Sequence, residues 1–180
     1  MVLRNTLLEQ KTDKMATKNT NLSHFSKEEV PNASLMRFGL VVSNWNQEVT
    51  IGLLQGAKQT LLEYGALESN IIIMDVPGSF ELVFGARIMA KRYKLSSIIC
   101  LGSIIQGETK HFDFVCNGVS LGIKDLNMCL DIPVIFGVLT GSNMQQVIDR
   151  SGGKHGNKGV EAAVTAIKMA KLNGKTYPCR

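Results

Sequence analysis

Residues 97–116 read Ser97-Ile-Ile-Cys-Leu-Gly-Ser-Ile-Ile-Gln-Gly-Glu-Thr-Lys-His-Phe-Asp-Phe-Val-Cys116. The β-branched run from Ile98 to Ile105 is bounded by polar residues, which is typical of a parallel strand covered on both faces. Apolar residues then recur at steps of three and four, which predicts a helix with one buried stripe: Phe112, Val115, Cys116, Val119, Ile123, Leu126 and Leu130. The stretch therefore predicts a strand, a turn and a helix.

The predicted turn holds polar residues that suit a binding site. Gln106, Gly107, Glu108 and Thr109 precede His111, which falls in the first turn of the helix. Ligands bind at the carboxyl ends of parallel strands, and a helix start offers free N–H groups to an anion. We therefore expect an imidazole beside a candidate phosphate site. The alternative, an ordinary surface histidine after a common turn, stays open at this point.

Length and composition favour a single globular domain. The chain has 180 residues, of which 44% are hydrophobic and 19% charged. The formal net charge is +5, but 20 basic and 15 acidic residues are interspersed, and there is only one tryptophan. The sequence thus argues against nucleic-acid binding and favours a mild preference for anionic small molecules.

Cysteine and histidine usage argues against a metal site. Cys100, Cys116, Cys129 and Cys179 form no CxxC pair, and the three histidines are scattered. No apolar run approaches the ~18 residues of a membrane span, and the N-terminus lacks the apolar core of a secretion signal. We expect no metal, no membrane association and a cytoplasmic location.

The first 36 residues differ from the rest of the chain. They are polar, rich in Asn, Thr, Ser and Lys, and carry no sustained period, so we predict a flexible N-terminal arm over residues 1–36 and one domain over 37–180. Met15, followed by Ala16, would also serve as a start.

After the arm, strand and helix patterns alternate. Strands are predicted at 38–43, 71–76, 98–105 and 133–139, and helices at 49–64, 80–93, 111–130, 144–150 and about 157–172. Short connections between them imply right-handed crossovers. The fold class is therefore α/β, a three-layer sandwich with a four-stranded parallel sheet between helical layers. The 111–130 helix carries few charges, so we also expect an oligomer.

Polar and aromatic residues lie at or near the end of each predicted strand. Trp45 follows the first strand, Ser79 and Glu81 the second, His111 the third and Phe136 lies in the fourth. An exposed indole stacks on flat rings, and a hydroxyl with a carboxylate suits a polyol. Taken singly, each residue is better explained by capping or packing than by binding. Their shared place at strand ends favours one binding site.

Five motifs occur in fixed order: Ser43-Asn-Trp-Asn46, Val76-Pro-Gly-Ser-Phe-Glu81, Gly102-Ser-Ile-Ile-Gln-Gly-Glu-Thr-Lys-His-Phe-Asp-Phe-Val115, Pro133-Val-Ile-Phe-Gly-Val-Leu-Thr140, and Arg150 with Gly156-Asn-Lys-Gly159. In this order and spacing, over residues 37–172, the chain resembles the 6,7-dimethyl-8-ribityllumazine synthase family of riboflavin biosynthesis. The resemblance implies a flavodoxin-like fold and condensation of 5-amino-6-(D-ribitylamino)uracil with 3,4-dihydroxy-2-butanone 4-phosphate. Phosphate and water are released, without a metal or organic cofactor.

The resemblance also implies roles for individual residues. His111 matches the proton-transfer residue, Trp45 the aromatic residue that stacks on the pyrimidine, and Arg150 the phosphate clamp. The remaining substrate-binding positions are the ribityl site at Ser79, Phe80 and Glu81, the ring-lining backbone of Ser103, Ile104 and Ile105, the phosphate turn at Glu108 and Thr109, the neighbouring subunit's wall at Phe136, and Lys158.

Two departures from the family pattern stand out. Gln106 takes a position that is often basic in the family, and Trp45 replaces the commoner phenylalanine while keeping a stacking face. Two rival interpretations remain. In one, Lys158 forms a Schiff base with a phosphorylated ketone, against the plain alternative that it pairs with Glu161. In the other, the chain is a weakly catalytic paralogue that acts as a shell or lumazine-binding protein.

The resemblance implies an assembly as well. Family members form pentamers with active sites at subunit interfaces, and some build sixty-subunit icosahedral shells. The compact joint Ser151–Gly156, without an insertion, resembles the shell-forming members. Riboflavin synthase is a candidate partner.

Overall fold

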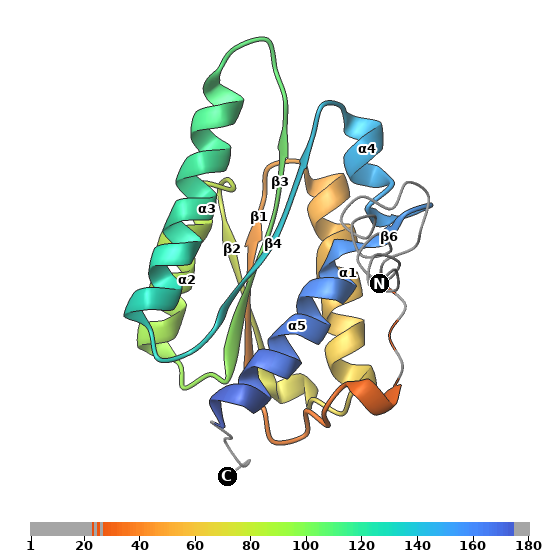
Figure 1. The fold of residues 1–180 in the computed structure, drawn as a ribbon, viewed down its shortest axis with the longest axis vertical. Helices are drawn as coiled ribbons and strands as arrows, with labels where there is room; N and C mark the ends of the chain where they lie inside the picture. Colours follow the sequence, from red (N-terminus) through yellow and green to blue (C-terminus); the bar gives the residue numbers. More distant parts are fainter. Residues whose placement is uncertain (1–22, 24, 26, 175–180) are drawn as a thin grey trace, which may run out of the picture.

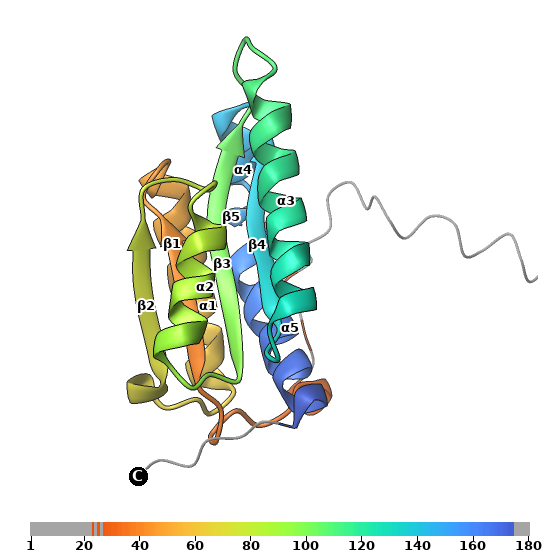
Figure 2. The same ribbon diagram turned by 90° about the vertical axis from the view of Figure 1, so that its left-hand side faces the viewer.

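Four parallel strands form the centre of the molecule in the computed structural model, which describes residues 23, 25 and 27–174. They are β1 (Phe38–Ser43), β2 (Ile71–Val76), β3 (Ser97–Ile105) and β4 (Val134–Gly141), in the spatial order β2-β1-β3-β4. Figure 2 shows all four running in the same direction. Their carboxyl ends therefore meet at one edge of the sheet, as the sequence predicted.

Helices cover both faces of the sheet. On one face lie α1 (Gln47–Glu63) and α5 (Lys158–Asn173), and on the other α2 (Leu82–Arg92) and α3 (His111–Cys129), as Figure 1 shows. Shorter elements are η1 (Lys27–Glu29), η2 (Glu68–Asn70), α4 (Met144–Ile148), β5 (Ser151–Gly153) and β6 (Gly156–Asn157). The predicted α/β sandwich with a four-stranded parallel sheet is confirmed.

The sheet separates two apolar cores. Successive side chains of a strand point to opposite faces, so Ile99 and Leu101 of β3 join the core under α1 and α5, whereas Ile98 and Cys100 join the core under α2 and α3. All four side chains are fully buried. Burial on both faces explains why this strand is a continuous apolar run rather than an alternating one.

The predicted Gly-rich joint after α4 is a small antiparallel hairpin. Strands β5 and β6 pair between Ser151 and Asn157. The Asn157 side chain accepts a hydrogen bond from the N–H of Gly159 (2.8 Å) and donates one to the carbonyl oxygen of Gly52 in α1 (2.9 Å). One asparagine thus caps α5 and ties the hairpin to α1.

The end of the predicted arm packs against the domain. Val30, Ala33 and Met36 are buried in the core under α1 and α5, and the Ser23 hydroxyl donates to the carbonyl oxygen of Asn157 (3.1 Å). Most of the remaining arm, including Met15, lies outside the described residues. The prediction of a flexible segment therefore stays a proposal for those residues.

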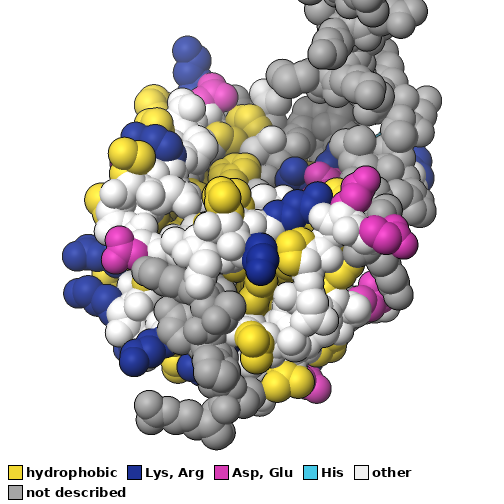
Figure 3. Space-filling model, turned by 60° about the horizontal axis from the view of Figure 1, so that its bottom comes forward, with side chains coloured by type: hydrophobic (Ala, Val, Ile, Leu, Met, Phe, Trp, Pro, Cys, Tyr) yellow, Lys and Arg dark blue, Asp and Glu magenta, His cyan; other side chains and the backbone are white. Residues whose placement is uncertain are grey.

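None of the described helices is long and apolar enough to cross a membrane. Figure 3 shows the end of the molecule opposite the carboxyl ends of the strands, where Lys and Arg side chains are spread among acidic, apolar and neutral ones. The described side chains in this view form no continuous basic strip of the kind that follows a nucleic-acid backbone.

Candidate active site

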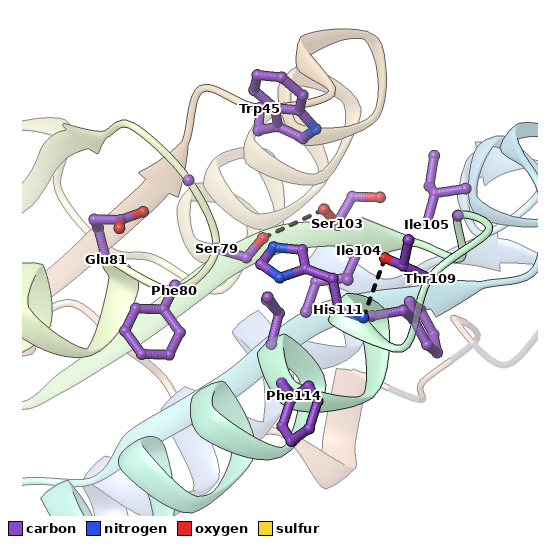
Figure 4. Close-up of a pocket in the computed structure, with 14 residues that line it drawn as sticks. Trp45, Ser79, Phe80, Glu81, Ser103, Ile104, Ile105, Thr109, His111 and Phe114 are labelled. Atoms are coloured by element: carbon purple, nitrogen blue, oxygen red, sulfur yellow. Dashed lines mark hydrogen bonds between the residues drawn. The ribbon is translucent and has the colours of Figure 1, made fainter.

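A pocket of about 600 Å³ lies at the carboxyl ends of β1, β2 and β3. Figure 4 shows residues from three different turns facing this space. Its walls are formed by Trp45, Gly78, Ser79, Phe80, Glu81, Ser103, Ile104, Ile105, Gly107, Thr109, His111, Phe112, Phe114 and Val115. Most of the site residues predicted from the sequence therefore lie together, and their individual roles remain predictions.

The turn from β1 into α1 carries the indole. Trp45 is 70% exposed, and Figure 4 shows its ring at the upper rim of the pocket. Its backbone N–H donates to the hydroxyl of Ser43 (3.3 Å). The chain's only tryptophan thus presents a face to the pocket instead of packing in the core.

Ser79 is held by the end of β3. Its hydroxyl, 6% exposed as a residue, donates to the carbonyl oxygen of Ser103 (3.3 Å) and so does not cap α2. A Cβ at Gly102 would lie 2.7 Å from Ser79 Oγ, so only glycine there permits this close approach. Glu81 stands at the N-cap position of α2 without a side-chain capping bond, and its exposed carboxylate is available to hydroxyl groups.

The turn from β3 into α3 carries the histidine. Thr109 Oγ1 accepts a hydrogen bond from the backbone N–H of His111 (3.3 Å), which holds the start of the helix. The imidazole is exposed and points from that start into the pocket (Figure 4). Gly107 has no heavy atom near the position of an added Cβ, so the turn leaves open space for a ligand beside the helix N-terminus.

A thiol near the pocket is not suited to nucleophilic catalysis. Cys116 directly follows the lining residue Val115, and burial together with the Asp113 carboxylate raises the pKa of its thiol. A raised pKa keeps the group protonated near neutral pH, where the thiolate would be the nucleophile. His111 and Glu81 are therefore the titratable side chains that face the cavity.

Four predicted binding residues do not line this pocket: Glu108, Phe136, Arg150 and Lys158. Glu108 belongs to the same turn as Gly107 and Thr109 but does not line the pocket, and Phe136 is partly exposed on the edge strand β4. Arg150 Nη2 and Lys158 Nζ both bind the Glu161 carboxylate, at 2.9 and 3.0 Å. Lys158 is thus already paired with an acid, which does not favour the Schiff-base interpretation.

The structure adds lining residues that the sequence interpretation did not assign to the site: Gly78, Phe112, Phe114 and Val115. Gly107, which belongs to the predicted binding turn, lines the pocket as well. Phe112 and Val115 belong to the apolar stripe, which indicated burial alone. Phe114 lies outside that stripe and is 72% exposed. An aromatic residue outside the buried stripe of a helix was therefore the sequence signal that could have assigned Phe114 to the site. Asn46, next to the indole, also escaped assignment.

Comparison with known proteins gives one consistent result. The family described as 6,7-dimethyl-8-ribityllumazine synthase matches residues 35–174. A protein of that name from Christiangramia forsetii is 57% identical over 159 residues, which cover 88% of this chain and 95% of that protein. Another from Flavobacterium johnsoniae is 58% identical over 158 residues, covering 88% and 83%. One from Parabacteroides distasonis is 52% identical over 159 residues, covering 88% and 99%.

Proposed function

The chain belongs to the 6,7-dimethyl-8-ribityllumazine synthase family, and we propose that its pocket catalyses the reaction for which that family is named. The protein is a transferase of riboflavin biosynthesis. It condenses 5-amino-6-(D-ribitylamino)uracil with 3,4-dihydroxy-2-butanone 4-phosphate. The observation that carries this proposal is the meeting of Trp45, Glu81 and His111 from three strand ends in one cavity.

The pocket suits the ribitylaminopyrimidine. Trp45 stacks on the flat ring from the rim, while Ser103, Ile104 and Ile105 at the end of β3 line the ring's edge. Glu81, with Ser79 and Phe80 beside it, accepts hydrogen bonds from the ribityl hydroxyls. Because the substrate supplies its own amine nucleophile, much of the rate enhancement comes from holding two bound molecules in reactive orientation.

His111 is the proposed proton-transfer residue. The amine attacks the ketone carbonyl and loses water to give an imine. Removal of the proton from the neighbouring hydroxyl-bearing carbon then expels phosphate and leaves an enol, which tautomerises to a second ketone. The ribitylamino nitrogen attacks this ketone and loses water, which closes the second ring. Each step moves a proton at the reacting atoms, which an imidazole does well near neutral pH. Figure 4 shows the imidazole inside the pocket, where those atoms would lie.

The phosphate end of the site is completed by a second copy of the chain. Phe136, Arg150 and Lys158 do not line the pocket of their own chain. Large apolar side chains at the pocket and on the two helices that start beside it are exposed: Trp45, Phe80 and Phe114 line the pocket, and Phe84 and Leu121 lie farther along α2 and α3. A neighbouring subunit that covers this apolar surface brings its Arg150 to the turn at Glu108 and Thr109. Glu108 contributes there through its backbone, since its carboxylate would repel phosphate.

We therefore propose a pentamer with active sites between its subunits. We also propose a sixty-subunit shell built from such pentamers, which the compact hairpin at Ser151–Asn157 supports. Mass photometry separates the two forms. Riboflavin synthase, which consumes the product, is the proposed partner. The free thiols of Cys100, Cys116 and Cys129 suit a reducing compartment and support the cytoplasm as the location.

The decisive experiment mixes the purified protein with both substrates and follows lumazine absorbance and phosphate release together. We expect both to rise at matched rates. If neither rises while the pyrimidine still binds, the chain is a lumazine-binding scaffold, which was the alternative interpretation. Borohydride added with the phosphorylated ketone separates the Schiff-base mechanism, because only a lysine imine would be trapped as a covalent adduct.

A further inference from the structure

Asn46 has an unusual backbone conformation at the entrance to the pocket. Its φ and ψ angles are 60° and 52°, and among the described residues it is the only non-glycine residue with a positive φ. L-residues avoid this left-handed region because the Cβ crowds the following carbonyl, and asparagine tolerates it better than most. Such outliers gather at functional sites, where the surrounding structure holds them in place.

The side chain of Asn46 joins two strand ends. Its Nδ2 donates to the carbonyl oxygen of Ser103 at the end of β3 (3.2 Å). The same carbonyl accepts the Ser79 hydroxyl, so one oxygen near the end of β3 holds residues from the turns after β1 and β2. On its other side, the loop is fixed by the N–H of Asn44, which donates to the carbonyl oxygen of Val76 at the end of β2 (2.8 Å).

Trp45 depends on this backbone for its position. Within its own chain the indole is 70% exposed, so few side-chain contacts of that chain restrain it. The residue after it makes the left-handed turn that begins α1, where the carbonyl oxygen of Asn46 accepts the N–H groups of Val49 and Thr50. The direction in which the Trp45 side chain leaves the loop is therefore set by the turn at Asn46 and by its hydrogen bond to Ser103.

We propose that Asn46 is a positioning residue: its left-handed backbone and its side-chain amide together fix Trp45 at the rim, facing the flat ring of the substrate. The proposal rests on the proposed function for the identity of that ring. The placement of the indole itself does not depend on any ligand.

The test compares three variants of the full-length protein. Asn46→Gly keeps the left-handed turn and removes the amide. Asn46→Asp keeps the size and shape of the side chain but places a carboxylate against the Ser103 carbonyl. Asn46→Ala removes the amide and also disfavours the left-handed turn. Asn127→Ala is the matched control. Asn127 also donates to a strand carbonyl, that of Val134 (2.8 Å), but at the opposite end of the sheet.

The first measurement needs no ligand. Trp45 is the only tryptophan, so fluorescence anisotropy reports on this side chain alone. We expect lower anisotropy in all three Asn46 variants and the parent value in Asn127→Ala. Parent anisotropy in both Asn46→Gly and Asn46→Asp, or an equal loss in the control, would overturn the proposal.

The second measurement separates the effect of the Asn46 variants on KM from their effect on kcat. We expect the Asn46 variants to raise KM for the pyrimidine substrate by roughly 3- to 10-fold, the worth of one hydrogen bond, with a smaller change in kcat. A raised KM with unchanged anisotropy would mean that the amide contacts the substrate directly, which also overturns the positioning role. A parent protein without turnover would reject the proposed function, while anisotropy would still decide the placement of Trp45.

Discussion

Arg150 Nη2 lies 2.9 Å from Oε1 of Glu161, and the other oxygen of that carboxylate lies 3.0 Å from Lys158 Nζ. The arginine and glutamate side chains are 28% and 15% exposed, so this is a partly buried cluster with one acid between two bases. The Nε of Arg150 is buried and has no hydrogen-bond partner among the described residues. The carboxylate thus holds the proposed phosphate-binding cations in place before any phosphate arrives.

Replacing Glu161 by Gln should destabilise the protein. The change leaves two positive charges together without their counter-ion. Because the cluster is partly buried, we expect the free energy of unfolding to fall by about 1–3 kcal/mol, between the values for exposed and for buried ion pairs. Urea denaturation measures it. Glu68→Gln is the control, because it breaks the Lys58–Glu68 pair at the exposed surface, and its transition midpoint should stay close to that of the parent. Equal shifts in the two variants would contradict a structural role for Glu161.

Replacing Arg150 should weaken binding of the phosphorylated ketone. A charge-assisted, two-pronged contact contributes about 1.5–3 kcal/mol, so Arg150→Ala should raise KM for this substrate roughly 10- to 100-fold. Arg150→Lys keeps the positive charge but loses the two-pronged guanidinium, so its KM for the phosphorylated ketone should fall between those of the parent and Arg150→Ala. Steady-state kinetics with each substrate varied in turn gives the result. KM for the pyrimidine substrate should change little, and equal increases for both substrates would argue against a phosphate clamp.

Replacing His111 by Ala should lower kcat while leaving the pocket intact. General acid–base catalysis contributes roughly 100-fold or more, and the orientation of the two substrates is unaffected by the change. Stopped-flow absorbance of lumazine formation gives the rate, and titration with the lumazine product checks that the pocket still binds. An unchanged rate would remove the proton-transfer assignment.

The strands, the helices and the location of the site were predictable because they follow from local periods and from parallel topology. The predicted ranges 38–43 and 71–76 match β1 and β2. Helix α2 begins at Leu82 rather than at residue 80, and the Ser79 hydroxyl bonds to Ser103 instead of capping the helix. That choice depends on a contact between distant residues, which no local pattern reveals.

The same limit explains the features that were missed. The pairing of Lys158 with Glu161, one helical turn apart, was foreseen as an alternative, but Arg150 reaches the same acid only because the β5–β6 hairpin folds back. The role of Asn46 could not be predicted for a similar reason, because its side chain bonds to Ser103 in β3, a residue far from it in the sequence. Sequence patterns locate strand ends, whereas the bonds between strand ends emerge only in the folded chain.

Complete burial of Cys100 raises the pKa of its thiol to about 12. In the unfolded chain a thiol has its ordinary pKa of about 8.5. Between these values the unfolded state loses a proton that the folded state keeps. The stability contributed by this group is therefore fully present below pH 8.5 and is lost as the pH rises toward 12.

Urea denaturation at pH 8 and pH 10 tests this with Cys100→Ala. Between the two pKa values the free energy of unfolding falls by about 1.4 kcal/mol per pH unit for one thiol. From pH 8 to pH 10 the parent should therefore lose about 2 kcal/mol more unfolding free energy than the variant. Any packing cost of the substitution is the same at both pH values and cancels in the difference. Cys129→Ala removes an exposed thiol and should lose as much stability as the parent. If Cys100→Ala followed the parent instead, the thiol would be ionising within the fold, which its complete desolvation opposes.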